Sequence, residues 1–103
     1  MGASEFTVRS SGKTAQEAFN RAVENARYED GHGGYSGTIA EKSEFKMVTP
    51  PVGKDPVEHT CDMMEDDDSW VQDKWGPAGC VLVRENPKVP GESIYCFFGW
   101  ASS

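Results

Sequence analysis

Residues 13–31 read KTAQEAFNRAVENARYEDG, and this stretch predicts a helix over residues 14–29. Thr14 and Glu17 have the spacing of a capping box, in which each side chain meets an unpaired amide near the helix start. Gly31 follows the last turn, where glycine commonly ends a helix. The apolar residues recur at helical spacing as one stripe, which consists of Ala15, Ala18, Phe19, Ala22, Val23 and Ala26. Because most of this stripe is alanine, we expect the helix to lie close against a sheet.

Segments with strand patterns lie on both sides of this helix. Residues 5–9, EFTVR, place Phe6 and Val8 on one face of a short strand. Residues 38–48, TIAEKSEFKMV, predict a second strand, whose mixed alternation indicates an edge position or a bulge. Prolines and a glycine in residues 49–56, TPPVGKDP, then interrupt the pattern.

A second helix is predicted to begin at Asp55. An aspartate followed by a proline suits the N-cap and the first helical position. An apolar stripe at helical spacing follows, formed by Val57, Cys61 and Met64. The run from Asp66 to Asp68 breaks or turns the chain, and residues 69–75, SWVQDKW, predict a further short helical segment.

Two largely apolar strands are predicted near the C-terminus, AGCVLVRE at residues 78–85 and SIYCFFGW at residues 93–100. A turn-rich connection between them favours an antiparallel hairpin, and their composition suits burial on two sides. The element order is then β-α-β-α-β-β. We therefore expect one α+β domain over residues 1–103, a small sandwich in which an antiparallel or mixed sheet carries its helices on one face.

The formal charge of −7 has a local origin. Residues 55–68 contain seven acidic residues and no lysine or arginine, whereas the rest of the chain carries ten of each sign. Such a surface repels phosphate backbones. We therefore expect no direct binding of DNA or RNA.

The sequence also predicts a cytoplasmic protein. It has no apolar run near the ~20 residues that span a bilayer, so no membrane association is expected, and residues 1–12, MGASEFTVRSSG, lack a secretory signal pattern. Cys61, Cys80 and Cys96 form no CxxC pair. We expect Cys80 and Cys96, which lie in apolar runs, to be buried free thiols.

Residues 31–38, GHGGYSGT, are the clearest candidate for a ligand site. They follow a helix and precede a strand, which is the reverse of a phosphate-binding loop. Successive glycine amides still suit a nest for an anion, although a helix cap with a plain connector explains them equally. The expected ligand-binding residues are these and nearby stacking or basic side chains: Gly31, His32, Gly33, Gly34, Tyr35, Ser36, Thr38, Lys42, Trp75 and Trp100.

No residue set indicates a metal, a cofactor or a catalytic reaction. His59 and Cys61 with nearby carboxylates match no zinc spacing, and the run from Asp66 to Asp68 lacks the pattern of a calcium loop. Neither His32 nor His59 has a nucleophile partner by motif. We therefore expect a protein that is not an enzyme.

Five phrases, MGASEF, AQEAF, GHGGYSGTIAEK, KWGPAGCVLV and FFGWASS, are distributed along the chain from one end to the other. In these phrases the chain resembles a group of small uncharacterised proteins of bacteriophages and prophages, notably those of actinobacterial hosts. The resemblance is weakest over residues 53–70. It implies an accessory phage protein that acts in the host cytoplasm.

Two functions are consistent with these patterns. The first is a non-enzymatic protein that binds and sequesters a small anionic, nucleotide-like ligand through residues 31–38 and Lys42. The alternative is a protein-interaction module that inhibits a host protein through its acidic segment and exposed aromatic residues. Unpaired strand edges also make a homodimer an expected state.

Overall fold

The predicted first helix is confirmed in the computed structural model, which describes residues 2–30, 37–66 and 68–102. It forms α1, Ala15–Asp30. Thr14 Oγ1 accepts a hydrogen bond from the Glu17 amide at 3.1 Å, as expected of a capping side chain. The Glu17 carboxylate pairs with Arg21, with Oε1 2.8 Å from Nη2.

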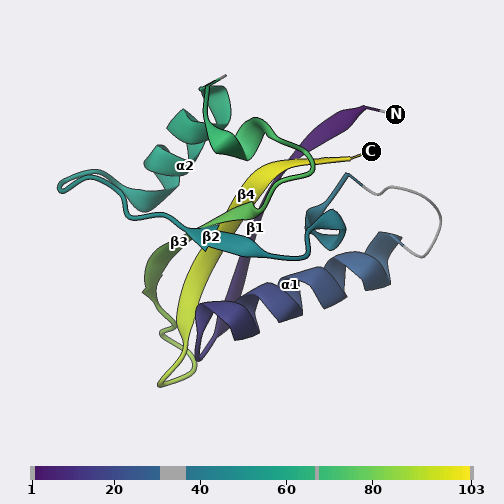
Figure 1. Cartoon of the computed structure of the whole chain (residues 1–103). Coiled ribbons are helices and arrows are strands. Elements are labelled where there is room, and N and C mark those ends of the chain that lie inside the picture. The colour runs from purple at the N-terminus through teal and green to yellow at the C-terminus, as the bar shows by residue number, and fades with distance from the viewer. Residues whose placement is uncertain (1, 31–36, 67, 103) are drawn as a thin grey trace.

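Four strands form one mixed sheet in the order β1-β4-β3-β2 (Figure 1). The strands are β1, Ala3–Gly12; β2, Phe45–Met47; β3, Ala78–Glu85; and β4, Ser93–Ser102. β4 pairs antiparallel with β1 and β3, whereas β2 runs parallel to β3. The α+β class, the element order and the predicted C-terminal hairpin are therefore confirmed.

The predicted strand over residues 38–48 is mostly wrong. Thr38 instead begins a single 3₁₀ turn, η1, Ile39–Glu41, where its side chain accepts a hydrogen bond from the Ala40 amide. Only β2, at the far end of the segment, is a strand. A threonine that bonds a nearby amide competes with strand pairing in this way.

The segment between β2 and β3 contains α2, Pro56–Glu65, and a single 3₁₀ turn, η2, Trp70–Gln72. The predicted start of the helix is confirmed, because Asp55 accepts a hydrogen bond from the Val57 amide at 2.8 Å. The predicted helical segment over residues 69–75 is limited to the one turn of η2.

The two helices lie on opposite faces of the sheet, and not on one face as predicted (Figure 1). Neighbouring residues of β4 show the reason, because Phe97 packs under α1 while Phe98 packs with Met64 of α2. In β3, Cys80 packs in the core beneath α1, and Val81 packs in the core beneath α2. Continuous apolar strands bury both faces, so the sheet needs a cover on each side.

Candidate functional site

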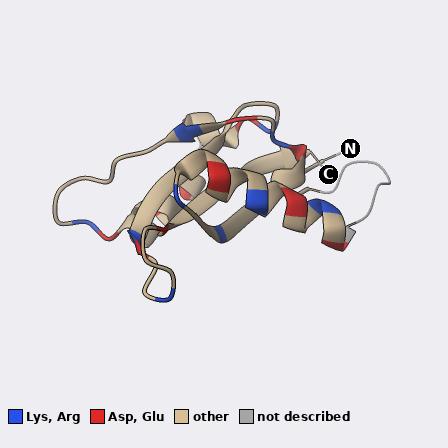
Figure 2. Cartoon of the chain, turned by 90° about the horizontal axis from the view of Figure 1, so that it is seen from below, with Lys and Arg blue, Asp and Glu red and all other residues tan. Residues whose placement is uncertain are grey.

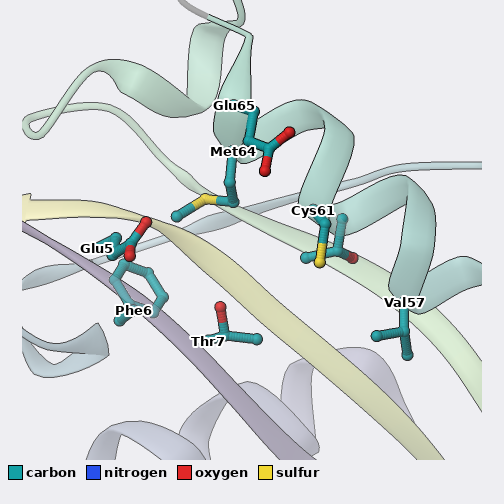
Figure 3. Close-up of a pocket in the computed structure, with 8 residues that line it drawn as sticks. Glu5, Phe6, Thr7, Val57, Cys61, Met64 and Glu65 are labelled. Carbon is teal, nitrogen blue, oxygen red and sulfur yellow. The ribbon is translucent and has the colours of Figure 1, made fainter.

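α2 packs on β3 and β4 and leaves a cavity between itself and the edge strand β1. This α2–β1 cavity has a volume of about 450 Å³. Its lining comes from two elements, Glu5, Phe6 and Thr7 of β1 and Val57, Thr60, Cys61, Met64 and Glu65 of α2 (Figure 3). The cavity therefore depends on the position of α2 against a strand that is distant in the sequence.

Hydrogen bonds at both ends of α2 fix this helix. Asp55 caps the start, and buried Thr60 donates from Oγ1 to the Pro56 carbonyl at 3.1 Å. At the C-terminal end, Gln72 Nε2 donates to the Met64 carbonyl at 2.7 Å. That bond satisfies one of the carbonyl groups that a helix end leaves unpaired and ties α2 to η2.

α2 presents two neighbouring stripes of side chains, each with i, i+4, i+7 spacing. The apolar stripe faces the cavity and consists of Val57, Cys61 and Met64. One position further along the helix lies the acidic stripe, which consists of Glu58, Asp62 and Glu65. Since one residue rotates a helix by about 100°, the acidic stripe lies beside the apolar one.

Glu5 and Glu65 lie on the two walls of the cavity, at the end beside Met64 (Figure 3). Val57 lies at the other end. Within the described residues, neither of these glutamates makes an ion pair, whereas Asp62 is paired with Lys54. The cavity therefore combines apolar walls with two carboxylates that can meet a cation.

The densest group of acidic residues, within residues 55–68, lies on the α2 side of the molecule. α1 carries acidic and basic residues in alternation along its length, as Figure 2 shows from the opposite side. The negative potential is therefore expected to be strongest beside the α2–β1 cavity.

The three cysteines are free thiols, and only Cys61 is exposed. Burial raises the pKa of Cys80 to about 12, and burial also raises the pKa of Cys96. Both predictions of buried thiols are confirmed. Because the thiolate is the reactive form, Cys80 and Cys96 are chemically inert, while Cys61 lies in the cavity wall.

The residues of the predicted ligand site have different surroundings in the structure. Gly31, His32, Gly33, Gly34, Tyr35 and Ser36 lie outside the described residues. The amide of Gly37, which follows them, donates to the Ser102 carbonyl at 2.8 Å, so this amide already has a partner. Thr38 caps η1 and borders a second cavity.

The ammonium group of Lys42 is engaged within the chain, which argues against its predicted role in binding a ligand. It is 4% exposed, and its Nζ donates to the carbonyls of Asp73, Lys74 and Gly76 at 3.3, 3.2 and 2.8 Å. Burial lowers the pKa of Lys42, and the Asp73 carboxylate partly opposes this effect. All three donors of the ammonium group are used, so Lys42 joins η1 to the loop before β3.

The two predicted tryptophans lie in different surroundings. Trp75 is 67% exposed, and Lys74 Nζ lies 5.3 Å from its ring centroid. Trp100 is half-buried and packs with the core on the α2 face. Since the cavity beside Thr38 is on the α1 face, the sheet separates Trp100 from it.

This second cavity, the α1–β1 cavity, has a volume of about 470 Å³. Its lining includes apolar side chains of both elements and the polar residues Asn25, Glu29 and Thr38. No lysine or arginine is among the described residues that line it. An anion bound there would therefore lie near the Glu29 carboxylate, with no lysine or arginine to balance its charge.

Sequence reasoning missed the α2–β1 cavity as a site, although part of its signal was present. The spacing of Val57, Cys61 and Met64 predicts a packing stripe, and the acidic stripe repeats with the same spacing one position later. The contribution of β1 could not be read from local sequence. Among the described residues, no group of three histidine, cysteine or acidic side chains could hold a metal ion.

No helix in the described part of the chain is both long and apolar enough to cross a membrane. In comparisons with known proteins, no family model matches the chain, and no curated protein or solved structure matches it either.

Proposed function

We propose that this chain is a non-enzymatic protein-interaction module that binds a basic segment of a partner protein at the α2–β1 cavity. One observation carries the proposal. An apolar cavity has carboxylates, Glu5 and Glu65, on its two walls at one end, and it lies beside a helix that carries an acidic stripe.

A lysine or arginine side chain suits this combination. Its aliphatic stem gains from contact with apolar walls while its charged end stays near the carboxylates. In the α2–β1 cavity, the stem would contact Met64, and the cation would lie near Glu65. Phosphate-bearing partners are disfavoured by the same charges.

The acidic stripe adds long-range attraction. Seven acidic residues without a basic one lie within residues 55–68. Such a surface accelerates the encounter with a positively charged partner, and salt screens the effect over a distance of about 8–10 Å. Binding is therefore expected to weaken with salt mainly through a slower association rate.

The resemblance to bacteriophage and prophage proteins supplies the proposed context. An accessory protein of that kind would act in the host cytoplasm, and its partner would be a host protein that exposes a basic segment. Inhibition of the host protein would follow from occupation of that segment.

A defined probe tests the interaction without knowledge of the partner. The probe is a fluorescent peptide of alternating lysine and leucine, and its control has glutamate in place of lysine. We expect binding of the lysine peptide alone, with an association rate that falls as salt rises. Equal binding of both peptides, or of neither, contradicts the proposal.

Matched variants locate the binding surface. Glu58→Gln, Asp62→Asn and Glu65→Gln together remove three charges from α2. The control removes three charges from exposed residues elsewhere, through Glu24→Gln, Glu44→Gln and Glu85→Gln. We expect the α2 variant alone to lose at least about tenfold in affinity for the lysine peptide. Each of the three carboxylates attracts the peptide during the encounter and can contact one lysine in the complex. Equal losses in both variants would mean that net charge acts without a site.

Binding of a small ligand at the α1–β1 cavity is the second candidate function. It is favoured by the position of Gly37 and Thr38, which border this cavity directly after the glycine-rich segment. A thermal-shift screen against cyclic and linear nucleotides tests it. A ligand at 100 times its dissociation constant stabilises by about 2.7 kcal/mol, so the absence of any shift would remove this candidate.

A further inference from the structure

The edge strand β1 is long and regular. It runs over ten residues, Ala3–Gly12, and pairs only with β4 in the sheet order. Its register with β4 is unbroken, and it contains no proline. Proteins that avoid edge pairing usually shorten, bulge or interrupt such a strand. The opposite edge, β2, has only three residues.

The middle of β1 is exposed on the α2 face of the sheet, through Glu5, Thr7 and Arg9, whereas Phe6 is buried beneath α1 on the other face. Glu5, Phe6 and Thr7 border the α2–β1 cavity and also the α1–β1 cavity. The side chains of Glu5 and Thr7 lie on the α2 face and that of Phe6 lies on the α1 face. The strand therefore separates the two cavities at this point. α2 leaves its face of the strand uncovered, and β1 is an edge strand of the sheet, so a further strand has access to its outer edge.

We propose that a second copy of this chain pairs with β1 through its own β1, antiparallel, about a two-fold axis at Thr7. In this register Thr7 lies opposite its own counterpart, and Phe6 lies opposite the second copy's residue 8. Glu5 lies opposite the second copy's residue 9, which is arginine in each chain. The two four-stranded sheets become one continuous sheet.

Charge selects this register among the alternatives. Glu5 and Arg9 are the charged residues of β1, and both are exposed. Within the described residues neither makes an ion pair. If the register shifts by two residues in either direction, Glu5 lies opposite Thr7 or Ser11 and has no charged partner. If the two strands run parallel and in register, Glu5 lies opposite the second copy's Glu5. Opposite charges that face each other across strands stabilise a pair, and like charges destabilise it.

The side chains of the two faces also agree with this register. Glu5, Thr7 and Arg9 lie opposite Trp100, Phe98 and Cys96 of β4. The last two of these belong to the core beneath α2, so the charged pairs form on the α2 face. Phe6 and Val8 belong to the α1 face and meet each other across the axis. A two-fold axis perpendicular to the sheet keeps each face on its own side, as an isologous interface requires.

The dimer and the proposed basic-partner site share Glu5, but Arg9 belongs to the dimer alone and the acidic stripe of α2 belongs to the partner site alone. The dimer engages Glu5 and leaves the acidic stripe of α2 unpaired by the second copy. The inference therefore stands independently of the proposed function, and each can fail alone. The α2 variant tests peptide binding, whereas Arg9→Glu, which lies outside the residues that line the cavity, tests the dimer.

Sedimentation equilibrium of the full chain measures the assembly. We expect a mass of twice 11.3 kDa that dissociates on dilution. Arg9→Glu and Glu5→Arg, made singly, place like charges opposite each other twice in the dimer. Each is expected to raise the dissociation constant at least about tenfold. The double variant exchanges the two charges and is expected to restore the dimer.

The charge exchange also separates the dimer from a folding defect. A variant that fails to fold would not be rescued by a second reversal, whereas a broken interface would be. Lys13→Glu is the control, because it makes the same charge change at an exposed position after β1. It is expected to leave the dissociation constant unchanged within about twofold. Hydrogen exchange at the β1 amides should slow as the dimer forms.

Three outcomes would overturn the inference. The first is a monomer at every concentration up to about 1 mM. The second is a dimer whose dissociation constant does not respond to either single reversal. The third is a double variant that dimerises as poorly as the single ones, because this result would refute the register centred on Thr7.

Discussion

Gly79 of β3 lies directly opposite Phe98 of β4, and the Phe98 ring occupies the space that a side chain at residue 79 would need. A Cβ atom at residue 79 would lie 2.4 Å from Phe98 Cζ. Phe98 is fully buried in the core beneath α2, so movement of its ring would disturb the side chains that pack around it. The absence of a side chain in β3 thus makes room for the largest residue of that core.

Gly79→Ala is therefore expected to destabilise the protein. Overpacking of a dense core typically costs about 1–3 kcal/mol, and we expect a loss in this range in urea unfolding. Gly53→Ala is the control, because nothing lies within 4 Å of its added Cβ and only its φ of +85° is unfavourable. A loss for Gly79→Ala no larger than for the control would mean that the Phe98 ring adapts.

Lys42→Met is expected to lower the free energy of unfolding by about 2–3 kcal/mol. The substitution removes three part-buried hydrogen bonds. The Asp73 carbonyl keeps the Gly76 amide as a donor, whereas the Lys74 and Gly76 carbonyls lose the Nζ partner, and unsatisfied polar groups are costly. Lys88→Met changes an exposed lysine and should shift the unfolding midpoint little. If both variants unfold alike, the Lys42 ammonium contributes nothing to stability.

The difference in stability between the native sequence and Lys42→Met should grow as the pH rises. Burial lowers the pKa of Lys42 in the folded protein. Between that pKa and its ordinary value near 10.5, the unfolded chain binds more protons than the folded one, so stability increases with pH. Parallel urea titrations of the two proteins from neutral pH to pH ~10.5 measure it, and a constant difference would contradict the lowered pKa.

One thiol should react with a disulfide reagent in the folded protein, and all three should react after unfolding. Cys61 is exposed, whereas the pKa of Cys80 is raised to about 12 by burial and Cys96 is also buried. Absorbance of the released thiolate counts the reactive groups. Cys61→Ser should abolish the reaction of the folded state, and a remaining fast thiol would show that the core opens.

The lysine-leucine peptide should protect Cys61 from the same reagent. Cys61 lies in the wall of the α2–β1 cavity, so a side chain in that cavity blocks access to its sulfur. The rate of modification should fall as the peptide saturates the protein, while the glutamate peptide leaves it unchanged. Binding without any protection would place the peptide away from the cavity.

The elements that were predicted best are those with a strong local pattern. The helix predicted over residues 14–29 is found one residue later at each end, because its capping threonine and apolar stripe act within the helix itself. The start of α2 at Asp55 is confirmed for the same reason. The hairpin of β3 and β4 follows from two apolar segments with a turn between them.

The parts that were predicted wrongly depend on contacts between distant residues. The apolar character of β3 and β4 indicated burial on two sides, but it did not specify that α2 supplies the second cover. Lys42 looked like a surface cation, since only the loop at residues 73–76 provides its three carbonyl partners. The α2–β1 cavity likewise requires β1 and α2, which no local pattern relates.

The pairing of Ala3 with Ser102 brings the first and last strands together side by side, with both ends near each other (Figure 1). A short linker could therefore join β4 to β1, and new ends could be opened in the loop before α2. In such a circular permutant, β3, β4 and β1 would follow one another as a meander. Pairing of β1 with β4 would become a local event, and local contacts form faster than distant ones.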